Sequence, residues 1–236
     1  MTFATHSLQE IIASAFSAEV WALLGPACLD TLYMILMATV LTFGFGTLIG
    51  IVLAWTNATG LDSRPAFYQP LSALINALRS LPSMIMIILT LPLARAITGK
   101  GYGANACIIA LAMSCIPMCA RLVETALLEV DRGKIEAAKA MGASNTRIMF
   151  TVVLPEAVPS IFRSFGVVVI AILSMTALAG AFGAGGIGNI AVQYGFNRFR
   201  YDILIATVLI LVVFAELVQL MFEGMARMVL KRRKML

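Results

Sequence analysis

The chain has 236 residues, of which 61% are hydrophobic and 12% are charged. One soluble domain of this length cannot hide so much apolar surface, so the composition excludes an ordinary soluble enzyme and favours the lipid bilayer as solvent. The formal net charge of +5 is expected to reflect membrane topology and anionic headgroups, because no nucleic-acid-binding motif accompanies it.

An amphipathic stripe begins the chain. Leu8, Ile12, Phe16 and Val20 recur at every fourth position, a spacing that predicts a helix. No basic region of a signal peptide precedes it. We therefore predict that residues 1–26 form an N-terminal extension with a short helix lying on the outer membrane surface. A frayed terminal extension is the alternative.

Five apolar runs follow, each long enough for the roughly 20 residues that cross about 30 Å of hydrocarbon. They lie near residues 29–55, 68–93, 105–127, 161–182 and 203–225. The runs are continuously apolar rather than alternating, which disfavours a β-barrel. We predict an all-α polytopic membrane protein with five transmembrane helices, in one domain over residues 27–225.

Two features of the early runs bear on helix packing and on a path through the membrane. Gly46 and Gly50 form a G-x-x-x-G that lets another helix approach closely, with chance spacing of small residues as the alternative. Arg79 lies inside the second run beside Pro82, which can kink a helix. A charge at that depth is expected to face a protein interior, a water-filled path or the interface, or else to snorkel.

The cysteines and the single histidine predict neither a metal site nor a catalytic one. Cys28 stands alone, and Cys107, Cys115 and Cys119 fall in the third run without a nearby histidine or carboxylate. His6 is the only histidine, so no histidine-based catalytic constellation can be proposed. We predict no catalytic residue and no bound metal.

Glu124 and Glu216 are two of the acids that lie within the apolar runs. Glu124 is expected close to the cytoplasmic interface, and Glu216 is a candidate partner for an arginine or a backbone group. Neither has an obvious paired acid or base within its own run.

Basic residues gather in two segments. Residues 226–236 form a basic tail, and residues 129–156 connect the third and fourth runs. The positive-inside rule places both in the cytoplasm, and an odd number of spans then places the N-terminus outside. The outer loops would hold Arg95, Lys100, Arg198 and Arg200.

The connection over residues 129–156 predicts a compact helix-turn-helix. Its first helix ends at Gly142, which can take a left-handed conformation, and Ser144 or Asn145 caps the next turn. Apolar side chains exposed beside charges are typical of a knob that enters a groove on a partner protein. A connector lying on the membrane surface is the alternative.

This connection resembles the EAA loop of ABC importer permeases. The family pattern is E-A-A-x-x-x-G followed, after nine residues, by I-x-L-P, and this chain differs only in having Val152 in place of Ile. The resemblance implies a type I ABC importer permease fold, in which the loop seats in a cleft of the ATP-binding subunit. It assigns the coupling role to Glu136, Ala137, Ala138, Met141 and Gly142.

Residues 76–99 and 180–202 resemble the methionine and D-methionine permease subgroup. The resemblance implies an inner-membrane homodimer with two ATPase subunits, which bind the ATP and Mg, and a methionine-binding protein outside. This chain would then hold no cofactor and would not be an enzyme. A permease for a related amino acid or a methionine analogue stays open. An ion-coupled secondary transporter is disfavoured, because we find no internal inverted repeat and no coupling site.

The glycine-rich segment after the fourth run also matches G-x-G-x-x-G, with Asp202 downstream. An apolar span rather than a short strand precedes it, so the match to a dinucleotide fingerprint is interpreted as a coincidence. The predicted topology places these glycines outside, as an outer gate or as simple turn residues. The candidates for the translocation path or gate are Arg79, Pro82, Met175, Gly183, Gly185, Gly186 and Gly188.

Overall fold

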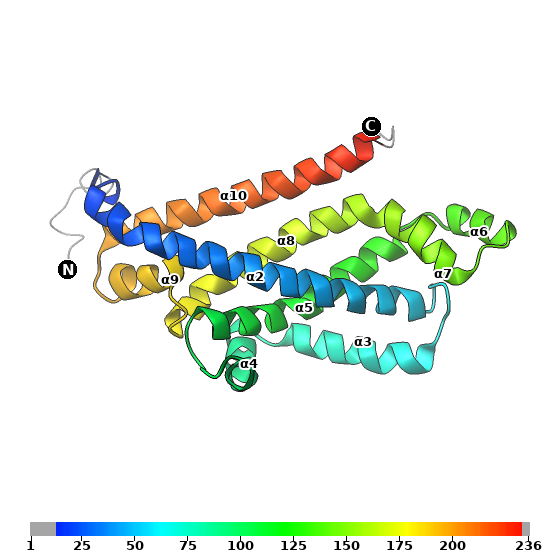
Figure 1. Cartoon of the computed structure of the whole chain (residues 1–236), viewed down its shortest axis with the longest axis horizontal. Coiled ribbons are helices and arrows are strands. Elements are labelled where there is room, and N and C mark those ends of the chain that lie inside the picture. Colours follow the sequence, from blue (N-terminus) through cyan, green and yellow to red (C-terminus); the bar gives the residue numbers. More distant parts are fainter. Residues whose placement is uncertain (1–12, 233–236) are drawn as a thin grey trace. The chain divides into compact units, whose positions relative to one another are not determined.

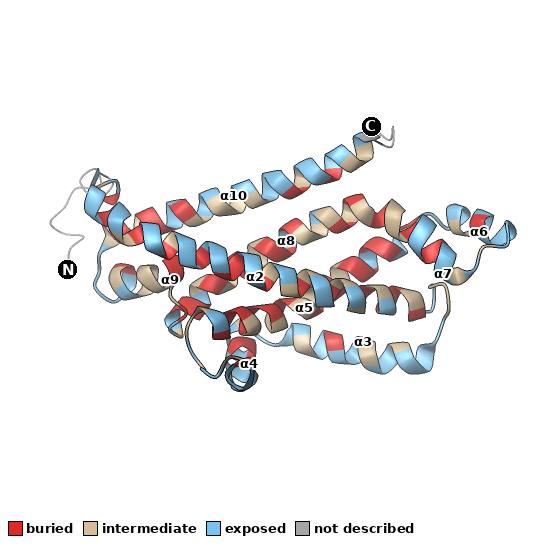
Figure 2. Cartoon of the chain, in the orientation of Figure 1, coloured by how far each residue is buried: buried red, intermediate tan, exposed pale blue. Residues whose placement is uncertain are grey.

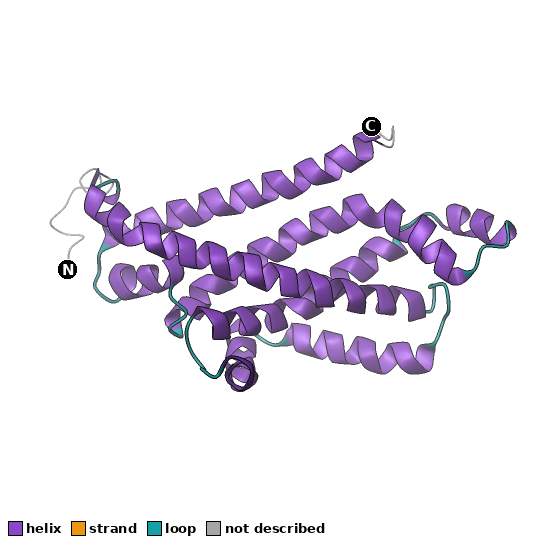
Figure 3. Ribbon diagram, in the orientation of Figure 1, coloured by secondary structure: helices purple, strands orange, loops and turns teal. Residues whose placement is uncertain are grey.

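The computed structural model describes residues 13–232, and every regular element among them is helical (Figure 3). In chain order the elements are α2 (Ala18–Thr56), α3 (Pro65–Ser80), α4 (Ser83–Thr98), α5 (Ala104–Leu128), α6 (Arg132–Ala140), α7 (Asn145–Ile148), the π-helical turn η2 (Met149–Val153), α8 (Leu154–Ala181), α9 (Gly186–Ile190), the π-helical turn η3 (Ala191–Phe196) and α10 (Tyr201–Arg232). The predicted all-α class is confirmed.

The chain divides into two compact units. Unit 1 takes the residues up to 40 together with 83–113 and 169–218, and unit 2 takes 41–82, 114–168 and the residues from 219 onward. The four long helices α2, α5, α8 and α10 each contribute to both units, whereas α3, α6 and α7 belong to unit 2 alone.

The membrane-spanning helices agree with the five predicted runs, with one difference. In the described part of the chain, four helical stretches are long and apolar enough to cross a membrane, and the pair α3 and α4 passes the same test together. The two helices of this pair are bent by 110° at the break between them. The run predicted over residues 68–93 is therefore two helices that meet at a sharp bend and not one straight helix.

The break follows from the chemistry of proline. Leu81 has φ −71° and ψ 137°, an extended conformation. Steric conflict with the ring of Pro82 disfavours the helical conformation at the residue before it. The sequence predicted that Pro82 kinks a helix. The structure shows a larger effect, because the helix ends before the proline and α4 begins after it.

The start of the first span also differs from the prediction. α2 begins at Ala18, so residues 18–26 are helical and continuous with the first span rather than a separate helix. Val20 and Leu24 are fully buried, whereas Phe16 lies in a turn before α2 and is 61% exposed. The stripe is therefore not a single helical face. Leu8 and Ile12 lie outside the described residues, and the placement on the membrane surface stays a prediction.

Unit 1 is held together by the first turns of α2 packed against α9 and the start of α10. A buried cluster joins Leu24 and Ala27 of α2 to Ile187 of α9 and to Ile203 and Ala206 of α10. Figure 2 shows the buried residues on α9 and along one side of α2.

Arg200, just before α10, pairs with Asp202 at 2.7 Å, and this hydrogen bonding raises the pKa of the Arg200 guanidinium.

Unit 2 is built on the close approach of α2 to α5. A Cβ added to Gly46 would lie 2.7 Å from Cys119 Cβ, and one added to Gly50 would lie 2.7 Å from the carbonyl oxygen of Ala120. These glycines therefore bring the two helices into backbone contact, and the packing role predicted for the G-x-x-x-G is confirmed. Beside them α3 runs along the last turns of α2 (Figure 1), joined by a buried cluster of Leu53, Ile75 and Ala120.

Replacing Gly50 by alanine is expected to lower the free energy of unfolding by about 1–3 kcal/mol, because the new methyl group must displace a backbone carbonyl. Thermal unfolding of the detergent-solubilised protein measures this. Gly44→Ala is the matched control, since nothing lies within 4 Å of a Cβ added there. Equal melting temperatures for the two variants would contradict the close α2–α5 contact.

Candidate functional site

The loop between α5 and α8 contains a short helix with defined ends. At its start the Asp131 carboxylate accepts a hydrogen bond of 2.8 Å from the backbone N–H of Gly133. At its end Gly142 has φ +80°, its N–H donates to the carbonyl of Lys139, and the N–H of Ala143 donates to the carbonyl of Ala138. This pattern is a Schellman motif. The end of α6 predicted at Gly142 is confirmed.

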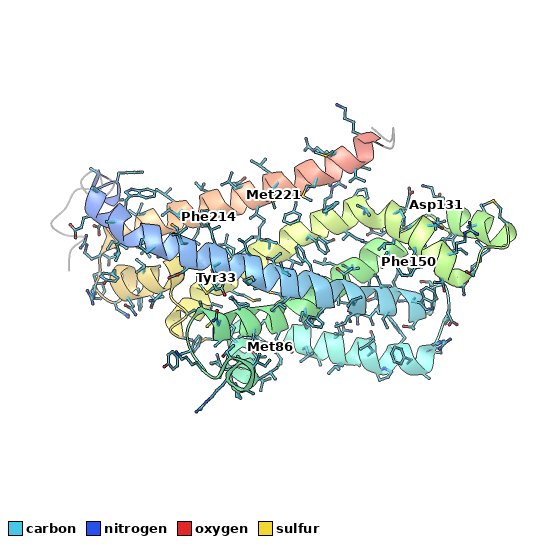
Figure 4. All side chains as sticks on the ribbon, in the orientation of Figure 1. Tyr33, Met86, Asp131, Phe150, Phe214 and Met221 are labelled. Carbon is cyan, nitrogen blue, oxygen red and sulfur yellow. The ribbon has the colours of Figure 1, made fainter. Side chains whose placement is uncertain are left out.

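The loop is attached to the rest of unit 2 at several points. The Ser144 side chain caps α7 by accepting from the N–H of Arg147 at 3.3 Å. The Asn145 side chain donates to the carbonyl of Leu61 at 2.8 Å, which ties α7 to the segment after α2. Lys134 of α6 pairs with Glu156 of α8. α6 and α7 lie side by side in Figure 1, and Figure 4 labels Asp131 before α6 and Phe150 in η2.

The residues predicted to couple to a partner divide into two groups. Glu136, Ala137, Met141 and Gly142 are exposed, and the Met141 residue is 81% exposed. Ala138 is only 5% exposed, so it lies on the buried face of α6. The exposed group is thus a small surface with a protruding apolar side chain.

A cleft lies behind this surface, within unit 2. It has a volume of about 180 Å³ and its lining includes Glu136 of α6, Leu61 of the segment after α2, Leu127 of α5 and Met149 of η2. The end of α5 and the connection between α2 and α3 therefore form two walls of this cleft, and α6 forms a third.

The sequence analysis missed the partner of Glu124. Arg121 lies three residues earlier on α5, and its Nη1 is 2.6 Å from Glu124 Oε2. The Tyr68 hydroxyl donates to Glu124 Oε1 at 2.9 Å, and the Asn57 amide donates to the same oxygen at 3.1 Å. The i, i+3 spacing of Arg121 and Glu124 was a usable signal, because such pairs share a helix face.

The glycine-rich segment after α8 is packed tightly inside unit 1. Gly183, Gly185 and Gly186 all have φ between +77° and +81°. The N–H of Ile187 donates to the Thr31 hydroxyl of α2 at 2.8 Å. A Cβ added to Gly188 would lie 2.3 Å from the Cα of Ala177.

The glycines of this segment are thus required by backbone conformation and by close packing. α8 precedes them where a nucleotide fold would have a strand, and Asp202 bonds to Arg200. The match to a dinucleotide fingerprint is a coincidence, as predicted.

The remaining gate candidates lie at the break between α3 and α4 and within α8. Arg79 is exposed in the last turn of α3, and Pro82 is exposed at the break that follows. Met175 is half-buried in α8. Glu216 is exposed in α10, with no partner among the residues that the structure describes.

Comparison with known proteins decides the family. Residues 46–234 match the family described as the binding-protein-dependent transport system inner membrane component. The chain belongs to this family. Its members are transport components, so this chain is a membrane component of a transport system and not an enzyme.

Individual relatives are similar over most of their length. A probable D-methionine transport system permease protein of Vibrio cholerae is 37% identical over 88% of this chain and 92% of that protein. The methionine import system permease protein of Bacillus subtilis is 38% identical over 79% of this chain and 85% of that protein. An inward-facing structure of the MetNI methionine ABC transporter superposes with a TM-score of 0.87 at 33% identity, covering 91% of this chain and 99% of that one.

These likenesses confirm two predictions from the sequence. The resemblance of residues 136–155 to the EAA loop pointed to this family, and the type I ABC importer permease fold is the one found.

Replacing Gly188 by alanine is expected to lower the free energy of unfolding by about 1–3 kcal/mol, because the methyl group would meet the backbone of α8. Thermal unfolding in detergent provides the measurement. Gly25→Ala in α2 is the control in the same unit, since nothing lies within 4 Å of its added Cβ. If Gly188→Ala has the same melting temperature as Gly25→Ala, the tight contact between α8 and α9 is contradicted.

Proposed function

We propose that this chain is the permease subunit of an ATP-driven importer that carries methionine, in its D and L forms, across the inner membrane. The observation that carries the proposal is the TM-score of 0.87 to a methionine ABC transporter, which covers 99% of that chain. The names of the Vibrio and Bacillus relatives support the same substrate. No group of the chain is assigned to bond-breaking chemistry.

The proposed complex contains two copies of this chain, two ATP-binding subunits and a methionine-binding protein. ATP and Mg are bound by the ATP-binding subunits, and this chain holds no cofactor. The α5–α8 loop and the basic C-terminal end face the cytoplasm, which follows from the positive-inside rule. The N-terminus then lies outside, where the binding protein docks.

The exposed surface on α6 is the proposed contact with the ATP-binding subunit. Glu136, Ala137, Met141 and Gly142 form it, and Met141 supplies the apolar side chain that enters the partner's groove. Ala138 contributes indirectly: its small buried side chain allows α6 to pack closely against the rest of unit 2.

Transport in this proposal is alternating access. Each state is favoured only by what binds to it differentially: nucleotide at the inner subunits and the loaded binding protein outside. The glycine-rich segment, with the half-buried Met175 of α8, is the proposed outer gate. Arg79 and Pro82 at the break between α3 and α4 are proposed to line the path. The gate glycines in question are Gly183, Gly185, Gly186 and Gly188.

Reconstitution in liposomes with the ATP-binding subunit and the binding protein tests the function directly. We expect methionine uptake that requires ATP, with D-methionine and L-methionine competing for it. Excess unlabelled related amino acids and methionine analogues test the alternative substrates. Uptake by the chain alone, driven by an ion gradient and independent of ATP, would overturn the proposal in favour of a secondary transporter.

Met141→Glu is expected to weaken binding of the ATP-binding subunit. Burying an apolar side chain of this size contributes about 1.5–3 kcal/mol, and about 1.4 kcal/mol corresponds to a tenfold change in affinity. We therefore expect affinity to fall about tenfold or more, measured by titrating the ATP-binding subunit onto the chain in nanodiscs. Met141→Leu keeps the apolar bulk and is the matched control. Unchanged affinity of Met141→Glu would remove Met141 from the contact.

A further inference from the structure

A buried polar network joins three elements of unit 2 around Glu124. Glu124 is only 3% exposed, and all the hydrogen bonds to its two oxygens come from Arg121, Tyr68 and Asn57. The Arg121 guanidinium also reaches α3, where its Nη2 donates to the carbonyl and to the hydroxyl of Ser72, at 2.8 Å and 2.5 Å. One carboxylate and one guanidinium thus connect α5 with α3 and with the end of α2.

Stability alone gives a weak reason for such a network. A buried ion pair loses the hydration of both charges, and well-packed apolar residues of similar volume often stabilise a protein as well or better. The Nε of Arg121 is buried and has no hydrogen-bond partner among residues 13–232, which adds a further unfavourable contribution. The network does supply directional hydrogen bonds, and each of these bonds fixes the position of another element relative to α5.

The elements fixed in this way include two walls of the cleft behind α6. Asn57 begins the segment whose Leu61 carbonyl is bound by Asn145 of α7. Leu61 and Leu127 both line the cleft behind α6, and Leu127 follows Glu124 by less than one helical turn on α5. The network therefore bridges the connection after α2 and the last turns of α5, immediately next to the loop.

We propose that the Glu124–Arg121 network is the positioning device of the coupling loop. It holds the two walls together, so that a displacement of α6 by the ATP-binding subunit moves α5, α3 and the end of α2 as one body. Glu124 and Arg121 act through these elements and touch neither substrate nor nucleotide. This inference rests on the proposed coupling function of α6.

The decisive variant replaces both charges by apolar side chains, Arg121→Met with Glu124→Leu. It removes the hydrogen bonds to Asn57, Tyr68 and Ser72 without leaving an unpaired buried charge, so the chain is expected to fold and to bind the ATP-binding subunit as the wild type does. Coupling free energies between sites correspond to factors of about 5–150. We therefore expect methionine transported per ATP hydrolysed to fall about fivefold or more, with ATP hydrolysis retained.

A second variant tests the same point with the ion pair left in place. Asn57→Asp keeps an oxygen that can accept from Thr59, as Asn57 Oδ1 does at 3.0 Å, but it loses the donor to Glu124. We expect the same fall in transport per ATP. Adding Glu124→Gln to this variant restores a donor and acceptor pair between positions 57 and 124, and is expected to recover part of the ratio.

The control is Glu223→Gln, which removes a carboxylate from a surface ion pair with Arg163 and Arg227 in the same unit. It is expected to leave transport per ATP unchanged. The positioning role would be overturned if both the apolar double variant and Asn57→Asp transported as much methionine per ATP hydrolysed as the wild type. A network that only stabilises the fold would change the melting temperature and leave this ratio unchanged. A wild-type complex without ATP-driven uptake would instead overturn the proposed function.

Discussion

The close approach of α2 to α5 is the constraint on which unit 2 depends. Because Gly46 and Gly50 carry no side chain, the two backbones meet, and the end of α2 comes to lie beside the last turns of α5. Only at that separation can the Asn57 amide reach Glu124, two turns of chain beyond Gly50. The polar network and the cleft behind α6 thus both follow from two missing side chains. Unit 1 uses the same device, since Gly188 brings α9 into contact with the backbone of α8.

Local chemistry was sufficient to predict much of this structure. Apolar runs gave the spans, because length and hydropathy alone decide whether a helix can cross hydrocarbon. Gly142 gave the end of α6, because a left-handed residue there is a property of the chain itself. The break at Pro82 was underestimated: the sequence locates a proline, but how far the two helices diverge depends on what packs against each of them.

What the sequence did not give was mostly contact across elements. Nothing near Glu124 in the chain identifies Tyr68 or Asn57 as partners, because the hydrogen bonds join residues 56 and 67 positions apart. The resemblance assigned Ala138 a coupling role together with its neighbours, and only the packing of α6 shows that Ala138 is buried. Nor does the sequence show that residues 18–26 continue directly into the first span, because α2 runs through Pro26 without a break.

The two helices that flank the α5–α8 loop extend through both compact units. α5 and α8, which flank the loop, each run unbroken from one compact unit into the other, while α3 and α4 lie in different units and meet at a break. In the proposed coupling, a displacement of α6 reaches first the parts of α5 and α8 that lie in unit 2. The role proposed for the Glu124 network is to keep the end of α5 attached to α3 and to the segment after α2 during that displacement. The break at Leu81–Pro82 is then where the remaining chain can change direction without stretching a helix.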